Sequence, residues 1–364
     1  MPRHADRMKR SESARYVVDA LRAYVERKPL GVETPPDWPL VVELASQNLV
    51  SPAVGLVLTR QLEVPNDVKE YFAAIIAWNR ERNAALENAI RDIVAALNRS
   101  GMTPLLLKGV ANLLDGLYPD PAARIIRDID ILVPADVVSV ASQVLAAIGY
   151  RTVELIPPPN KRWDSFNQHL PMQANEEAGI GVELHYELVR LYLVRLINAK
   201  DAMARALPRG RNGLRYLVLC PTDRVTHNIV HAQIQDSLHM KGLVDLRQIV
   251  DLALLIDECG GAIDWREIKG RFAAAGAIAV LHDQVAVLRE MFGRDVPITV
   301  ADTAATATRL RHAIAKSPTG FTTLRDIAAQ YWAGFRGHPL LAINLLKPLW
   351  WPQRIRGWRA RLKR

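Results

Sequence analysis

The chain has 364 residues, of which 49% are hydrophobic and 23% are charged, and its formal net charge is +9. This length favours two or three structural units, and the hydrophobic content excludes a wholly disordered chain. The two cysteines, Cys220 and Cys259, are too few for a disulfide framework and indicate a reducing compartment. No apolar run reaches the roughly 18 residues that a membrane helix needs, and the N-terminal residues lack the apolar segment of a secretory signal. We therefore expect a cytoplasmic protein.

The positive charge is concentrated at the two ends of the sequence. Residues 1–10 contain four Lys or Arg and one Asp, and residues 354–364 contain six Lys or Arg and no acidic residue. These two segments account for the whole charge of +9, so residues 11–353 are formally neutral. A nucleic-acid groove needs a basic surface on the body of the protein. Nucleic acid is therefore not expected as a partner.

Residues 1–100 are predicted to form an N-terminal helical region. Apolar residues recur there at helical spacing. Near its end we expect one long helix, with Asn66 or Asp67 as the capping residue and Gly101 closing it.

Residues 101–190 are predicted to be a small α/β unit, because short apolar or alternating runs are interleaved there with two helical stretches. The expected strands are residues 103–108, 128–133 and 150–155, followed by a hairpin of residues 169–175 and 179–188. A helix is expected after the first strand, and a second one over residues 134–149, between a proline and a glycine.

Residues 191–340 are predicted to be a C-terminal helical domain, with one helix starting at Pro221. Residues 341–364 form a basic tail rich in Trp and Arg. The tail either docks on the body through Trp350 and Trp351 or contacts an anionic membrane surface or partner. The predicted fold class is α+β, with a small mixed-sheet core flanked by helical lobes.

Two carboxylates occupy alternate positions of the predicted strand at 128–133. In a strand, residues two apart point to the same face, so Asp128 and Asp130 lie together and Ile129 faces the other way. Neighbouring carboxylates repel each other unless a cation neutralises them, and Mg²⁺ suits such oxygen ligands. Glu183, on another predicted strand, could complete a two-metal site for attack on phosphorus.

The alternative is purely structural. In that case Asp128 caps the strand entrance, and Asp130 forms an ion pair with Arg124 or Arg127.

The stretch from residue 105 to 188 resembles the uncharacterised nucleotidyltransferase family of the polymerase-beta-like nucleotidyltransferase superfamily. The matching motifs are LLLKG, LYPDP, RDIDILV, LAAIGY and VELHYEL. The resemblance implies a nucleotidyltransferase core and transfer of a nucleoside monophosphate from ATP or another NTP to a hydroxyl group. It implies Mg²⁺, with Mn²⁺ as an alternative, held by the catalytic residues Asp128, Asp130 and Glu183.

The same resemblance places Gly109 in a phosphate-binding turn at a helix start. The superfamily usually has Gly-Gly or Gly-Ser at this turn, whereas this chain has Gly109-Val110 and lacks the serine hydroxyl. Lys108 is the candidate to supply the missing phosphate contact.

Four further residues are candidates for nucleotide binding: Arg124, Arg127, His185 and His231. Arg124 and Arg127 either clamp phosphate oxygens or form ion pairs with Asp120 or Asp128. His185 shares a strand face with Glu183 and is either a contact near the metal and substrate or a hydrogen-bonded structural residue.

His231 either lines the nucleotide or acceptor cleft or is a buried structural histidine. His227 and His231 have the i, i+4 spacing of zinc ligands, but the glutamate of the zinc-protease motif and nearby cysteines are missing. Asp245, Arg247 and Asp251 either form an internal ion network or contact substrate.

The sequence leaves the acceptor open among a sugar, a peptide and a small molecule, and the family resemblance implies a biosynthetic role. Two alternative functions remain. One is kinase-like transfer of the terminal phosphoryl group in the same cleft. The other is a non-catalytic binding protein.

Overall fold

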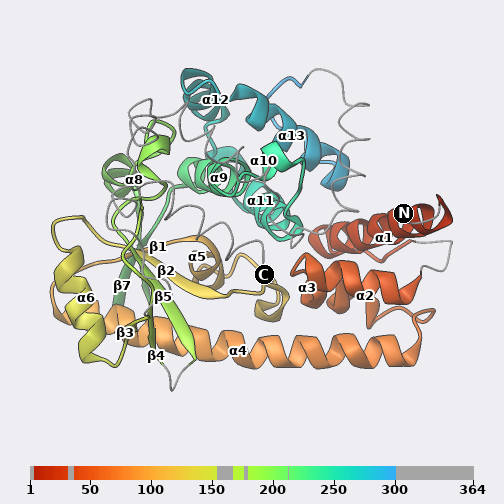
Figure 1. Cartoon of the computed structure of the whole chain (residues 1–364), viewed down its shortest axis with the longest axis horizontal. Helices are drawn as coiled ribbons and strands as arrows, with labels where there is room; N and C mark the ends of the chain where they lie inside the picture. The colour runs from red at the N-terminus through yellow and green to blue at the C-terminus, as the bar shows by residue number, and fades with distance from the viewer. Residues whose placement is uncertain (1–3, 32–36, 154–166, 176–178, 212, 301–364) are drawn as a thin grey trace, which may run out of the picture.

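The computed structural model describes residues 4–31, 37–153, 167–175, 179–211 and 213–300. Helices come first and last in this described part, with a mixed sheet between them, so the predicted α+β fold class is confirmed (Figure 1). Within the described part, no helix is both long enough and apolar enough to cross a membrane. The basic tail at 341–364 lies outside the described residues.

The described residues of the N-terminal region form four helices, and the last of them runs along one side of the molecule beneath the sheet (Figure 1). They are α1 (His4–Glu26), α2 (Trp38–Gln47), α3 (Ser51–Leu58) and α4 (Asn66–Arg99). The long helix α4 was predicted, but its N-terminal capping residue is Pro65, so Asn66 and Asp67 lie in its first turn. Gly101 follows the helix with a φ of +78°, a conformation that favours glycine.

The sheet has the strand order β3-β4-β5-β2-β1-β7-β6 among the described residues. Its strands are β1 (Leu105–Leu106), β2 (Asp128–Leu132), β3 (Arg151–Thr152), β4 (Gln173–Asn175), β5 (Ile180–His185), β6 (Leu207–Arg211) and β7 (Leu214–Val218). The pairs β2–β5 and β1–β7 are parallel and the other pairs are antiparallel. The predicted hairpin is present as β4 and β5.

The hairpin β6–β7 corrects the expectation that only helices follow the α/β unit. It lies in the range predicted to be helical and joins the sheet through the pairing of β7 with β1. Tyr216 and Val218 are buried, whereas the residues between and around them are mostly exposed or half-buried. Arginine and glycine in this stretch obscured the short alternating pattern.

The remaining helices cover the sheet and complete the C-terminal region. They are α5 (Lys108–Leu114), α6 (Val138–Ala147), α8 (Ala199–Arg205), α9 (Pro221–Ile229), α10 (Leu238–Lys241), α11 (Leu246–Cys259), α12 (Trp265–Ala274) and α13 (Ile278–Phe292). The helix expected to start at Pro221 is present, and it continues as a π-helical turn, Val230–Gln235. Single π-helical turns are frequent at functional sites.

Two apolar cores hold the molecule together. One is shared by the N-terminal helices α1 to α3 and the C-terminal helices α9, α11, α12 and α13, so the two ends of the described chain pack together (Figure 1). Arg22 of α1 reinforces this contact by donating to the carbonyl oxygens of Glu290 and Met291. The second core lies between the sheet, α6 and the C-terminal half of α4. Together they fix the central strands that carry the candidate site.

Candidate metal and nucleotide site

The register between β2 and β5 brings acidic residues from distant parts of the chain together. The strands are parallel, and Asp130 lies opposite Glu183. Ile129, Ile131 and Val182 point away from the site and are fully buried. Because side chains alternate along a strand, burying the isoleucines forces the carboxylates onto the opposite face.

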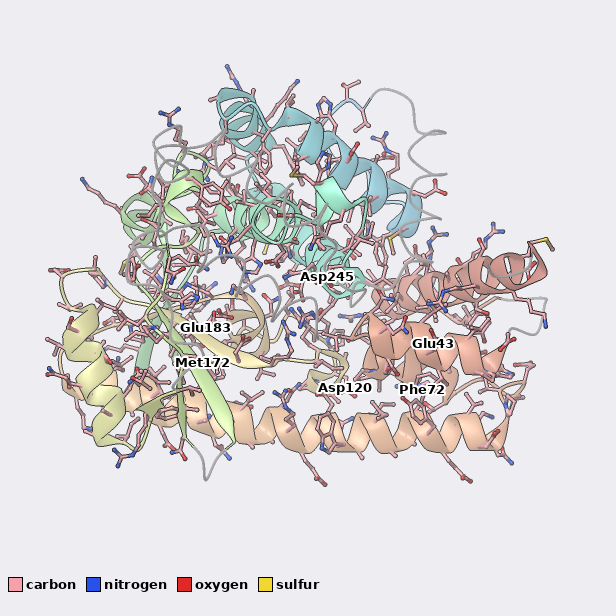
Figure 2. The ribbon with its side chains drawn as sticks, viewed as in Figure 1. Glu43, Phe72, Asp120, Met172, Glu183 and Asp245 are labelled. Carbon is pink, nitrogen blue, oxygen red and sulfur yellow. The ribbon has the colours of Figure 1, made fainter. Side chains whose placement is uncertain are left out.

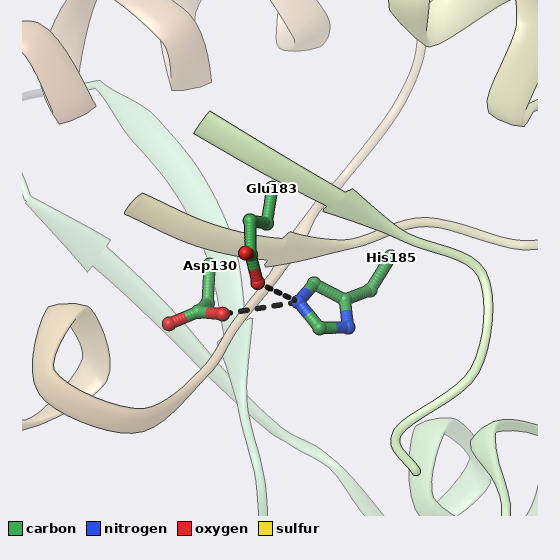
Figure 3. A group of neighbouring side chains, drawn as sticks. All are labelled: Asp130, Glu183 and His185. Atoms are coloured by element: carbon green, nitrogen blue, oxygen red, sulfur yellow. Dashed lines mark hydrogen bonds and ion pairs between the residues drawn. The ribbon is translucent and has the colours of Figure 1, made fainter. Parts of the chain in front are cut away.

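A compact polar group forms around Asp130 (Figure 3). The Asp130 Oδ1 atom accepts hydrogen bonds from Lys108 Nζ at 2.6 Å and from His185 Nε2 at 3.0 Å. Glu183 Oε2 lies 3.5 Å from the same His185 nitrogen. One ligand atom each from Asp130, Glu183 and His185 can be chosen so that all lie within 4.8 Å of one another. This spacing suits a single metal ion.

Asp128 lies beside this group without being part of it. It shares the strand face of Asp130, as predicted, and is half-buried. Burial raises the pKa of Asp128, and the charges of Asp130 and Glu183 raise it further. The structure therefore brings the three predicted acids into one electrostatic environment, with Asp130 and Glu183 in the closest arrangement.

Lys108 connects β1 to α5 and has an unusual backbone conformation. Its φ is +50°, in the left-handed region that side chains other than glycine rarely adopt. Such strain is concentrated at functional sites. The bend directs the Lys108 ammonium group onto Asp130. Burial opposes the charge on Lys108, but Asp130 and Glu183 outweigh it and raise the lysine pKa.

Gly109 is required by close packing rather than by its backbone dihedral. A Cβ atom at this position would lie 3.1 Å from Cγ1 of Ile126, which is tighter than ordinary van der Waals contact. The predicted Lys-Gly turn is therefore present beside the carboxylates. The positive φ falls on the lysine and not on the glycine.

The titratable side chains of the group shift one another's pKa values. Burial opposes the charge on His185, but its hydrogen bonds with Asp130 and Glu183 outweigh burial and raise the pKa of this ring. Burial opposes ionisation of Asp130, yet Lys108 and His185 hold the pKa of this carboxyl well below its usual range. Burial likewise opposes ionisation of Glu183, and its hydrogen bond with His185 is the main cause that lowers the pKa of the glutamate. Asp128 adds a third acid, whereas Lys108 is the permanent cation that contacts Asp130 directly among the residues that the structure describes. A divalent ion would offset the remaining negative charge.

His169 is a residue of this site that the sequence reasoning missed. Its Nε2 atom lies 3.8 Å from Glu183 Oε2, and its ring centroid is 5.0 Å from that of His185. Burial lowers the pKa of His169, and the charge of His185 lowers it further. His169 pairs with His185 through an antiparallel bridge. Extending the β4–β5 register would place His169 opposite Tyr186, so a shift of one residue brings it to His185, and no signal in the sequence indicated that shift.

The two candidate arginines have different surroundings. Arg124 is buried, and its Nε and Nη2 atoms donate to Asp251 at 2.9 and 2.7 Å. This corrects the predicted ion pair with Asp120 or Asp128, since Asp120 is paired with Arg80 instead. Asp251 comes from α11, which packs in the core shared by the N-terminal and C-terminal helices and supplies a buried acid beside Arg124. Arg127 is exposed, and its charge acts on Asp128.

The Arg124–Asp251 pair belongs to an internal network. This was one of the two alternatives predicted for Asp245, Arg247 and Asp251, the other being contact with substrate. Tyr118 Oη donates to Asp251 Oδ1 at 2.5 Å. Asp245 caps α11 by accepting from the backbone N–H groups of Arg247 and Gln248. These contacts occupy the side chains with protein partners, so Arg124 is better explained as a positioning residue than as a phosphate clamp.

His227 and His231 lie on the wall of a pocket that also contains Lys108. His227 is buried and its Nε2–H donates to the carbonyl oxygen of Leu188 at 3.1 Å. Burial lowers the pKa of His227 to about 3, and burial also holds the pKa of His231 well below its usual value. Both rings are therefore neutral near pH 7. His231 Nδ1 lies 3.4 Å from Asp236 Oδ2, at which geometry it makes no hydrogen bond.

A sequence model of the uncharacterised nucleotidyltransferase family matches residues 34–293, which is most of the chain and confirms the resemblance seen over residues 105–188. No curated protein and no solved structure matches the chain. The family is one of enzymes that transfer phosphorus-containing groups. The match includes the strands that carry Asp130 and Glu183 together with the helices on either side. The chain therefore belongs to the uncharacterised nucleotidyltransferase family.

Proposed function

We propose that this nucleotidyltransferase is metal-dependent and moves a nucleoside monophosphate from an NTP, expected to be ATP, to a hydroxyl group of an acceptor. The observation that carries the proposal is the pairing of Asp130 with Glu183 across parallel strands, with Lys108 on the same carboxylate oxygen. The donor chemistry fits a divalent metal, because the carboxylates outnumber the permanent cation beside them. Asp128, Asp130 and Glu183 are the proposed carboxylate ligands, for Mg²⁺ or Mn²⁺.

The metal, when bound, would supply positive charge that stabilises the triphosphate and the transition state. Lys108 is proposed to leave Asp130 and contact a phosphate oxygen, which replaces one anionic partner by another. Gly109, which packs against Ile126, is proposed to present its backbone to the phosphates next to Lys108, and the exposed Arg127 lies at the same edge of the sheet. His231, beside Lys108 in the pocket, offers a neutral hydrogen-bonding ring to the nucleotide or acceptor.

In the proposed reaction the acceptor oxygen attacks the α-phosphorus, and the bond from this phosphorus to the bridging oxygen of the β-phosphate breaks. Pyrophosphate leaves, and the acceptor proton passes to a carboxylate or to solvent. Glu183 is the proposed group for orienting this hydroxyl, because its side chain is 23% exposed whereas that of Asp130 is 3% exposed.

The acceptor is proposed to be a sugar, a peptide or a small molecule rather than nucleic acid, since the charge of the central 343 residues is balanced. The cytoplasmic location and a membrane or partner contact of the basic tail likewise stay predictions. The proposed transfer of a nucleoside monophosphate is the same whichever acceptor, location or tail contact applies.

The test is label transfer from ATP carrying radioactive phosphorus at either the α or the γ position. Purified protein is incubated with each label, with Mg²⁺ or Mn²⁺, and with a metabolite extract as the source of acceptor. We expect α-label in the acceptor and release of pyrophosphate, and no transfer in Asp130→Asn. Asp136→Asn, which changes an exposed carboxylate just after β2, is the matched control and keeps full transfer. Transfer of the γ-label would identify a kinase, and equal transfer by both variants would remove the proposed site.

A further inference from the structure

His185 is buried completely, and its ring nitrogen Nε2 points into the gap between two carboxylates (Figure 3). The histidine ends β5 two residues after Glu183, so both side chains share one face of the strand. Its Nε2 atom lies 3.0 Å from Asp130 Oδ1 and 3.5 Å from Glu183 Oε2. The imidazole therefore lies as close to the carboxylate oxygens as a third ligand of a shared ion would.

The other ring nitrogen is held by the backbone outside this group. His185 Nδ1 lies 3.3 Å from the carbonyl oxygen of Glu187. A carbonyl oxygen only accepts, so Nδ1 carries a proton. A metal ion that binds Nε2 would displace the proton that this nitrogen donates to Asp130. Metal-binding histidines commonly donate their second N–H to a carbonyl or carboxylate in this way. The Glu187 side chain accepts from the backbone N–H groups of Leu188 and Ala199, which fixes this loop.

The group already accommodates a cation against Asp130. The Lys108 ammonium lies 2.6 Å from Oδ1, the same oxygen that faces His185. When Lys108 moves to a phosphate, as the proposed function requires, this oxygen retains a nitrogen neighbour as well as Glu183. The ligand set left for an ion then contains two carboxylates and one imidazole, with Asp128 beside them.

Nitrogen in the ligand set changes which ion the site prefers. Mg²⁺ binds oxygen ligands and water and has little affinity for imidazole. Imidazole favours first-row transition ions, and Mn²⁺ among them also accepts the carboxylate and phosphate oxygens that a nucleotide site provides. We infer that His185 Nε2 is a direct ligand of the metal, and that the site therefore selects Mn²⁺ over Mg²⁺. This inference rests on the proposed metal site and specifies its ion.

The first experiment detects nitrogen bound to manganese in the full-length wild-type protein. Pulsed electron paramagnetic resonance is recorded on Mn²⁺-loaded protein with natural nitrogen, and on protein whose histidines carry ¹⁵N. We expect couplings typical of a directly bound imidazole, which shift with the isotope. Bound Mn²⁺ without such couplings would overturn the inference. Because this comparison uses only the wild type, it does not depend on whether a variant folds.

Two variants then identify the histidine. His185→Asn is expected to lose the nitrogen couplings, whereas His169→Asn keeps them, because His169 is 3.8 Å from Glu183 and is not a proposed ligand. Couplings that persist in His185→Asn and vanish in His169→Asn would show that His169 binds the metal instead of His185, which would overturn the inference.

Calorimetry measures the preference between ions. We expect wild type to bind Mn²⁺ on the order of tenfold more tightly than Mg²⁺. His185→Asn should lose about 10- to 100-fold in Mn²⁺ affinity and much less in Mg²⁺ affinity. Equal or tighter binding of Mg²⁺ by wild type would contradict the inference.

The outcomes separate this inference from the proposed function. Label transfer that requires Asp130, in a protein whose bound Mn²⁺ has no nitrogen ligand, overturns the role of His185 alone. Nitrogen-bound Mn²⁺ in a protein that transfers no label supports the role of His185 and overturns the proposed reaction.

Discussion

Two buried ion pairs, Arg124–Asp251 and Lys108–Asp130, look alike in distance and differ in how completely their partners are used. Arg124 and Asp251 are 2.7 Å apart, with side chains 6% and 2% exposed. Both aspartate oxygens accept from Arg124, Tyr118 supplies one more donor, and the remaining arginine nitrogen donates to a carbonyl oxygen. This pair is closed, because its main hydrogen-bonding groups are matched by protein partners.

The Lys108–Asp130 pair is open by the same comparison. Lys108 and His185 share one oxygen of Asp130, while Glu183 and Asp128 add negative charge nearby. Side chains of Lys108 and Glu183 are 17% and 23% exposed, so the group is reachable from solvent. Figure 2 shows Glu183 in the left half of the view, at the sheet and below the C-terminal helices. A closed pair holds α11 against the core, and an open pair leaves charge for a ligand.

The largest expected effect comes from Asp130→Asn. Removing this carboxylate should reduce nucleotidyl transfer by at least about a thousandfold, since a metal supplies several kcal/mol of transition-state stabilisation. Turnover with saturating Mn²⁺ or Mg²⁺ measures the loss, and circular dichroism checks that the fold is retained. Transfer within a factor of three of wild type would mean that the open pair is only structural.

Breaking the closed pair, Arg124–Asp251, should lower the unfolding free energy of the protein. Asp251→Asn leaves the buried Arg124 charge without its partner, which costs about 3–5 kcal/mol of unfolding free energy. Asp257→Asn, on the same helix, breaks a partly exposed pair with Arg294 and should cost less than about 1 kcal/mol. Urea unfolding measures both. A similar small loss in the two variants would show that burial does not distinguish these pairs.

His227 lines the same pocket as Lys108 and Asp251, and its titration should make the unfolding free energy depend on pH. Burial lowers its pKa to about 3, with smaller contributions from the charges of Lys108 and His185. Between pH 6.5 and 3 the unfolded chain binds a proton that the folded chain does not, so stability falls as pH decreases. From pH 7 to 4.5 this residue should account for up to about 3 kcal/mol of the loss. His227→Gln should flatten the dependence measured by urea unfolding, and an unchanged slope would contradict a neutral buried ring.

The smallest expected effect concerns the cation of the open pair. Lys108→Met removes the ammonium that competes for Asp130, so Mn²⁺ affinity in the absence of nucleotide should rise by up to about tenfold, or roughly 1.4 kcal/mol. Affinity for the metal–ATP complex should fall, because the phosphate contact is lost. Calorimetry measures both, with the exposed Lys200→Met as control. Weaker binding of Mn²⁺ alone to Lys108→Met would show that Lys108 helps to position the metal ligands and does not compete with the metal for Asp130.

The sequence predicted the parts of the site that depend on local periodicity. Alternation with Ile129 and Ile131 placed Asp128 and Asp130 on one face, and the same rule placed His185 beside Glu183. The sequence placed Glu183 on another strand as a third acid, but the parallel pairing of β2 with β5, which brings it opposite Asp130, was not predicted. Register between strands 55 residues apart has no local signal.

Features that arise from packing were not predicted. The partner of Arg124 lies 127 residues away on α11, and nothing near either residue indicates the other. The left-handed φ of Lys108 contradicts its intrinsic preference and is imposed by the junction of β1 and α5. The hairpin β6–β7 was missed because its outer strand is rich in arginine and glycine, which weakens the alternating pattern.

The most direct test is calorimetric binding of ATP with and without Mn²⁺ to wild type, Asp130→Asn and Asp251→Asn, at a temperature where all three are folded. The open-site account predicts metal-dependent binding of one ATP per chain to wild type and to Asp251→Asn, and its loss in Asp130→Asn. ATP binding that needs no metal, or that survives in Asp130→Asn, would contradict it.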